Sequence, residues 1–79
     1  MVMYEAGMLA RSKAGHDKAQ MYIIKEVDDT YVYLVDGRIR TLGHPKKKKK
    51  KHVQIVHGIY NMKELDDAGI RKLIKDWMK

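Results

Sequence analysis

The sequence has no cysteine, no phenylalanine and a single tryptophan among its 79 residues. The absence of cysteine excludes disulfides and thiolate metal sites. A core without Phe must come from Val, Ile, Leu, Met and Tyr, and in so short a chain it is thin. The longest apolar run, residues 31–35, is far shorter than a membrane span, and residues 1–10 hold no apolar stretch typical of a targeting signal. We therefore expect one cytoplasmic domain that is not associated with a membrane.

Groups suited to catalysis are also scarce. Ser12 is the one serine, and it lies in no nucleophile-elbow motif. The adjacent carboxylates at 28–29 and 66–67 are explained by turns and a helix cap. The four histidines, at positions 16, 44, 52 and 57, match no standard zinc spacing. We predict that the protein is not an enzyme and that it uses no metal, no other cofactor and no small-molecule substrate.

Positive charge is abundant, and nearly all of its excess lies in one run of six lysines. Residues 1–45 hold six basic and six acidic side chains, and residues 52–79 hold five basic and four acidic ones, so the run supplies six of the seven net charges. Lysine binds phosphate as a flexible point charge, so the run favours a nucleic-acid partner. A solvated loop without a specific role and a nuclear localisation patch are the alternatives. His44 and His52 flank the run and are predicted to contact phosphate or bases.

Five short segments have the composition of β-strands. They are residues 7–12, 21–27, 31–35, 38–42 and 52–56. Asp36-Gly37 predicts a tight hairpin between the third and fourth segments, and the lysines after Pro45 are expected to form an extended, solvated basic loop over residues 44–52. This pattern predicts a mainly β fold, a small five-stranded antiparallel barrel followed by a C-terminal α-helix.

The predicted hairpin would have two different faces. The face expected in the core carries Val32, Leu34 and Ile39. The opposite face carries Tyr31, Tyr33, Arg38 and Arg40. Aromatic rings beside guanidinium groups suit base stacking and phosphate binding, although tyrosines on a small barrel can also simply cover its core.

Residues 66–78 are predicted to be the helix, with Asp66 as N-cap and Asn61 as a competing start. The positions of Ile70, Leu73, Ile74 and Trp77 form one apolar stripe, expected to pack on the barrel rather than recruit a partner. His57-Gly58 is expected to end the last strand. The predicted organisation is therefore a barrel over residues 1–57 and a linker with the amphipathic helix over residues 58–79.

Three separated segments, residues 7–24, 31–42 and 45–53, carry motifs that occur together in one family. Over about residues 6–56 the chain resembles the KOW-domain RNA-binding proteins of bacteria, which are similar to the KOW-bearing large-subunit ribosomal proteins of archaea and eukaryotes. The resemblance implies an SH3-like barrel that binds RNA, in particular ribosomal RNA of the large subunit, with ribosomal proteins as further partners in translation. Its signature segment would be residues 11–24, with a loop at 14–19. The family usually has glycine where this chain has Ala19.

The complete set of predicted RNA-binding residues joins the lysine run, the signature loop, the hairpin and the two flanking histidines. It comprises Lys46, Lys47, Lys48, Lys49, Lys50, Lys51, Arg11, Lys13, His16, Lys18, Tyr33, Arg38, Arg40, His44 and His52. The alternative function is an SH3-like protein-interaction module that docks a partner through its barrel or its C-terminal helix.

Overall fold

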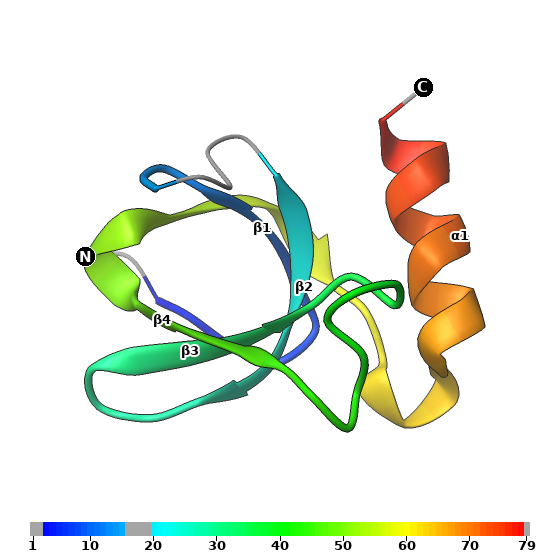
Figure 1. Cartoon of the computed structure of the whole chain (residues 1–79), viewed down its shortest axis with the longest axis horizontal. Coiled ribbons are helices and arrows are strands. Elements are labelled where there is room, and N and C mark those ends of the chain that lie inside the picture. The colour runs from blue at the N-terminus through cyan, green and yellow to red at the C-terminus, as the bar shows by residue number, and fades with distance from the viewer. Residues whose placement is uncertain (1–2, 16–19, 79) are drawn as a thin grey trace.

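Five antiparallel strands form one curled sheet in the computed structural model of the chain, which describes residues 3–15 and 20–78, apart from the side chain of His57. The strands are β1 (Met8–Ser12), β2 (Met21–Val27), β3 (Tyr31–Val35), β4 (Lys46–Lys49) and β5 (Val53–Ile59), in the spatial order β4-β3-β2-β1-β5. The sheet curls into a half-barrel and the helix α1 (Asp67–Trp77) stands on one side of it (Figure 1). The fold is therefore the mainly β, SH3-like barrel with a C-terminal helix that the sequence predicts.

Irregular pairing explains part of the curl. Between β2 and β3 the register shifts at Lys25, so that Ile24 pairs with Leu34 while Glu26 pairs with Tyr33. The pairing of β1 with β5 shifts on both sides of Leu9. Such bulges bend a strand and increase its local twist. The Lys25 side chain, at the first of these bulges, donates to the carbonyl of Leu42 at 2.7 Å.

The core consists of two clusters, one on each side of the sheet. The inner cluster fills the half-barrel with Ala10, Tyr22, Ile24, Val32, Leu34 and Val53. The outer cluster lies between the sheet and α1 and contains Leu9, Met21, Ile23, Val35, Ile70 and Ile74. Because β2 contributes to both clusters, its apolar run from Met21 to Ile24 is continuous rather than alternating.

The helix begins and packs as predicted. The Asp66 side chain accepts from the backbone N–H of Gly69 at 2.7 Å and caps the helix. Ile70 and Ile74 are buried against the sheet, whereas Trp77 is 40% exposed at the far end. The competing start at Asn61 instead caps a separate 3₁₀ turn, η2 (Met62–Glu64). The apolar stripe thus covers the outer face of the barrel.

The predicted hairpin at Asp36-Gly37 is wrong. The Asp36 Oδ1 atom accepts from the backbone N–H groups of Arg38 and Arg40, so these amides do not join a ladder with β3. The segment folds as a compact turn beside α1 and leaves Ile39, which the sequence predicts in the core, 83% exposed. Val32 and Leu34 are buried as predicted.

The predicted solvated loop over residues 44–52 is wrong as well. Lys46–Lys49 form β4, which pairs with β3, and Lys50–His52 form the 3₁₀ turn η1. A lysine can occupy a strand at the sheet edge because its aliphatic stem covers apolar surface while its ammonium stays in water. Edge lysines also discourage pairing with other chains.

The last strand is longer than predicted. β5 continues through His57 and Gly58 to Ile59, and Tyr60 still bonds to Gly7 through its backbone N–H at 2.8 Å. The break expected at His57-Gly58 is therefore wrong by a few residues.

Candidate nucleic-acid interface

The outer surface of β3 and β4 carries two tyrosines and two lysines, which we call the Lys/Tyr face. Antiparallel pairing sets Tyr31 opposite Lys49 and Tyr33 opposite Lys47. Because side chains alternate along a strand, all four lie on one side of the sheet. The Lys47 ammonium lies 4.2 Å from the centre of the Tyr31 ring, within cation–π range. The tyrosines are half-buried and the two lysines are exposed.

Asp28 holds the tyrosines of this face in place. Its Oδ1 atom accepts from the backbone N–H groups of Thr30 and Tyr31, at 3.0 and 2.6 Å, and its Oδ2 atom accepts from the Tyr33 hydroxyl at 2.8 Å. These hydrogen bonds lower the pKa of Asp28, and the bond from the backbone N–H of Tyr31 has the largest effect, followed by the bond from the Tyr33 hydroxyl. The same carboxylate raises the pKa of Tyr33. The protonated Tyr33 hydroxyl donates to Asp28, and this hydrogen bond holds the Tyr33 ring in position.

The other lysines of β4 point to the opposite side. Lys46 and Lys48 are half-buried opposite Leu34 and Val32, which belong to the inner cluster. The Lys48 ammonium donates to the carbonyl of Ala14 at 2.9 Å. The run is thus divided by strand geometry, and two of its ammonium groups, those of Lys47 and Lys49, are presented together on the outer face.

A second group of basic residues lies where β4 turns into β5. The backbone N–H of Lys13 donates to the carbonyl of His52 at 2.8 Å, so the start of the signature loop lies beside η1. Tyr4 anchors the same turn, since its hydroxyl donates to the carbonyl of Lys50 at 2.9 Å. The Lys50 ammonium donates to the carbonyl of Asp29 at 3.1 Å. The lysine run and the first described residues of the predicted signature loop, Lys13 and Ala14, are therefore neighbours in space.

A shallow hollow of about 340 Å³ adjoins this turn. It is lined by Asp29, Thr30, Lys49, Lys50 and Lys51. Lys49 and Lys51 are exposed there. The hollow and the Lys/Tyr face therefore share Lys49 and adjoin each other.

The remaining predicted site residues lie elsewhere. Arg11 donates to the Gln54 side chain on β5 at 2.8 Å. Arg38 and Arg40 belong to the compact turn beside α1, so the Tyr/Arg face predicted from the hairpin does not form. His44 is exposed in the next turn, where its backbone N–H bonds to Thr41. His16, Lys18 and Ala19 lie outside the described residues.

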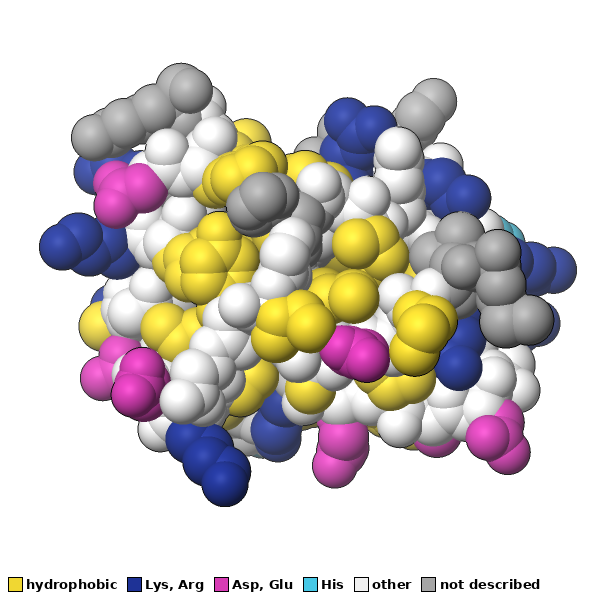
Figure 2. All heavy atoms as spheres, turned by 180° about the vertical axis from the view of Figure 1, so that it is seen from behind, with side chains coloured by type: hydrophobic (Ala, Val, Ile, Leu, Met, Phe, Trp, Pro, Cys, Tyr) yellow, Lys and Arg dark blue, Asp and Glu magenta, His cyan; other side chains and the backbone are white. Residues whose placement is uncertain are grey.

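Figure 2, which views the molecule from behind, shows hydrophobic side chains across the middle of the rear face and Lys and Arg side chains toward its edges.

Two further properties concern the described residues only. Within residues 3–15 and 20–78, no group of three or more His, Asp or Glu side chains is placed to hold a metal ion. In that same part of the chain, no helix has the length and apolar character needed to span a membrane.

No protein-family model matches the chain, and no curated protein matches it either. Function is therefore inferred from the residues and their arrangement.

Proposed function

We propose that this chain is a non-enzymatic RNA-binding protein of the cytoplasm. The Lys/Tyr face and the adjoining basic turn form its RNA-binding surface. By the sequence resemblance to KOW-domain proteins, the RNA is ribosomal RNA of the large subunit, with ribosomal proteins as neighbours.

The observation that carries this proposal is the pairing of rings and ammonium groups on one face. Tyr31 and Tyr33 offer ring surfaces to unpaired bases, and Lys47 and Lys49 lie directly across the strand pair to meet the phosphates of the same strand. Rings that stack on bases and cations that track the backbone are the two elements of single-strand recognition. A merely solvated lysine loop would not place its charges against aromatic rings.

The distribution of charge supports the same proposal. The sequence outside the run carries a net charge of only +1, so the field of the molecule is concentrated at β4 and η1. Such a field steers a polyanion to one side of the protein. Affinity then comes mainly from released counterions and depends on salt.

The proposal is tested by the salt dependence of binding to a single-stranded segment of large-subunit ribosomal RNA. Each neutralised phosphate contributes about 0.7–0.9 to the slope of log K against log salt. The Lys47→Gln/Lys49→Gln variant should therefore lower the magnitude of the slope by about 1.5. Fluorescence anisotropy at several salt concentrations measures both slopes.

A matched control removes two other exposed lysines. The Lys63→Gln/Lys72→Gln variant has the same net charge, but its changes lie in η2 and α1. Its slope should stay close to that of the unchanged protein. Equal slopes for the two variants would show that overall charge, rather than the Lys/Tyr face, drives binding, and would contradict the proposal.

The alternative function, a protein-interaction module, is less well supported. Its proposed docking helix already buries Ile70 and Ile74 against the sheet, which leaves Trp77 as the exposed end of the stripe. Binding through that end would depend weakly on salt and would be lost in Trp77→Ala. RNA binding at the Lys/Tyr face should survive this substitution.

A further inference from the structure

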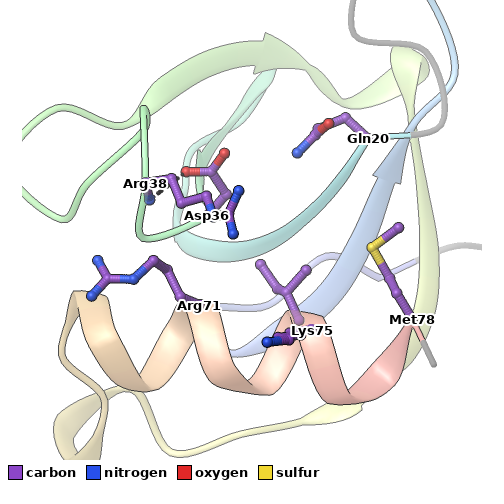
Figure 3. A pocket seen from close by; sticks show the side chains of 7 residues that line it. Gln20, Asp36, Arg38, Arg71, Lys75 and Met78 are labelled. Atoms are coloured by element: carbon purple, nitrogen blue, oxygen red, sulfur yellow. Dashed lines mark hydrogen bonds between the residues drawn. The ribbon is translucent and has the colours of Figure 1, made fainter.

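A pocket of about 370 Å³ lies between α1 and the barrel, and none of the residues that line it belongs to the Lys/Tyr face. Gln20, Asp36 and Arg38 line it from the barrel side, and Arg71, Lys75 and Met78 line it from the helix, together with Ile74 (Figure 3). Its volume is at the lower end of the range typical of small-ligand sites. It contains three cationic side chains from two segments that are distant in the sequence.

Hydrogen bonds hold the segments that carry the cationic side chains of this pocket. The Arg71 guanidinium donates to the carbonyl of Gly37 at 2.6 Å, which fixes its direction. Arg38 is held nearby because its backbone N–H donates to Asp36 Oδ1 at 2.9 Å. Arg38 and the exposed Lys75 line the same hollow from opposite sides, whereas the Arg71 guanidinium points away from it and holds the turn to the helix (Figure 3). A guanidinium and an ammonium that line one hollow favour a phosphate.

The rest of the lining suits a base more than a bare anion. Ile74 and Met78 provide an apolar wall, and Met78 is 63% exposed, so its thioether is available to a flat ring. Gln20 supplies an amide, and Asp36 supplies a carboxylate that is almost fully buried. A carboxylate beside an amide favours a base edge that presents N–H donors, as guanine does, over uracil, which presents mainly acceptors.

We propose that this pocket binds one nucleotide, with its phosphate on Arg38 and Lys75 and its base against Ile74 and Met78. The shared chemistry is that of a nucleoside monophosphate unit, and we assign it to an unpaired nucleotide of the bound RNA. That assignment rests on the proposed function. It would give the protein a selective contact, which the lysines cannot supply because they bind phosphate without reading bases.

The test follows the methyl groups of Ile74 and Met78 in the full chain by NMR during titration with 5′-GMP, 5′-UMP and inorganic phosphate. GMP should shift both methyl signals and bind more tightly than UMP, whereas inorganic phosphate should leave the Met78 methyl unchanged. Lys75→Gln should weaken GMP binding about fivefold or more, because a charge-assisted bond is lost. Lys72→Gln, an equal charge change on the same helix outside the pocket, should alter it less than about twofold, since exposed charges at a distance are screened.

Three results would overturn the proposal. The first is an equal effect of Lys75→Gln and Lys72→Gln. The second is a response to inorganic phosphate as strong as that to GMP, which would leave a simple anion site. The third is the absence of any methyl shift with GMP. None of these results affects RNA binding at the Lys/Tyr face, which is measured separately by the salt slope.

A second titration, with a short single-stranded RNA that contains guanine, identifies the source of the nucleotide. If the bound nucleotide belongs to RNA, the RNA shifts the same two methyl groups, and Lys75→Gln reduces the shift. If GMP shifts them and bound RNA does not, the pocket takes free nucleotides and the assignment to RNA is wrong. If GMP shifts them and the RNA does not bind at all, the proposed function fails while the pocket's ligand class stands.

Discussion

At the scale of single residues, three aspartates determine where the chain stops pairing as a sheet. Each accepts backbone N–H groups through one side-chain oxygen, so these groups are satisfied without a neighbouring strand. The three sets are Asp28 with Thr30 and Tyr31, Asp36 with Arg38 and Arg40, and Asp67 with Leu42. Asp28 shapes the turn beside the Lys/Tyr face, whereas Asp36 and Asp67 bind the following segment to the helix.

The lowered pKa of Asp28 predicts a pH-dependent contribution to stability. Since the folded protein favours the ionised carboxylate, the contribution is present above the ordinary pKa of 3.8 and is lost as the pH falls through the lower, folded value. The difference in urea midpoint between the unchanged protein and Asp28→Asn should therefore be largest at neutral pH and shrink toward about pH 3. Tyr33→Phe, which removes one donor to Asp28, should weaken this pH dependence. A midpoint difference that is constant with pH would contradict the role of the ionised carboxylate.

The exposure of Ile39 predicts that it contributes little to stability. Ile39→Ala should change the free energy of unfolding by less than about 0.5 kcal/mol. Leu34→Ala removes a fully buried side chain of the inner cluster and should cost about 2–5 kcal/mol. Urea unfolding of the two variants measures the contrast. Similar, large losses for both would indicate that Ile39 is in the core and that the predicted hairpin forms after all.

At the scale of elements, α1 and the turn at Asp36-Gly37 fit together closely. Gly37 has a φ of +77°, and a Cβ atom added there would collide with the carbonyl of Asp67 and come within 2.9 Å of the Arg71 side chain. Arg71 and Asp67 bond back to this segment, at Gly37 and Leu42. Figure 1 shows the segment between β3 and β4 lying beside the helix. The turn therefore sets the position of the helix, and with it the pocket.

Gly37→Ala should destabilise the protein by about 2–4 kcal/mol, because it adds strain at positive φ to a clash with backbone. Gly43→Ala is the matched control, since an added Cβ has nothing within 4 Å there, and it should change stability by less than about 0.5 kcal/mol. Thermal or urea unfolding measures both. A loss of less than about 1 kcal/mol in Gly37→Ala would contradict the close approach of turn and helix.

Most elements of this fold could be predicted from local sequence. The spans of β2 and β3 follow from their β-branched and aromatic residues, and Asp66 with the stripe from Ile70 defines α1. β4 could not be predicted, because a run of lysines has no apolar period. Whether it pairs with β3 depends on the distant bonds that remove residues 36–42 from the sheet.

In the candidate site, too, local sequence predicts some features, whereas others depend on contacts between distant residues. The basic residues of the run were identified from composition, and their division into inward and outward lysines follows only from the register with β3. The predicted face that Arg38 shares with Tyr33 depends on the hairpin, whereas in the fold Arg38 lines the same pocket as Arg71 and Lys75. No local signal links these helix residues to residue 38, since more than thirty positions separate them in the sequence.

At the scale of the whole molecule, a nearly neutral barrel carries its excess charge along one edge strand and its following turn. The helix covers another part of the outer face of the sheet and forms a second cationic site against the barrel. We propose that the Lys/Tyr face provides most of the affinity for RNA and that the pocket provides the selectivity for a particular nucleotide. This arrangement predicts that RNA lies along β3 and β4 before it reaches the helix.

Ultraviolet crosslinking in cells, followed by identification of both the crosslinked peptide and the attached RNA, tests this account most directly. Trypsin cleavage after Lys25 and Arg38 releases residues 26–38 as one peptide, which contains Tyr31 and Tyr33. The account predicts that this peptide carries the main crosslink and that the attached RNA is large-subunit ribosomal RNA. Recovery of no RNA, or of crosslinks that spare residues 26–38, would contradict it.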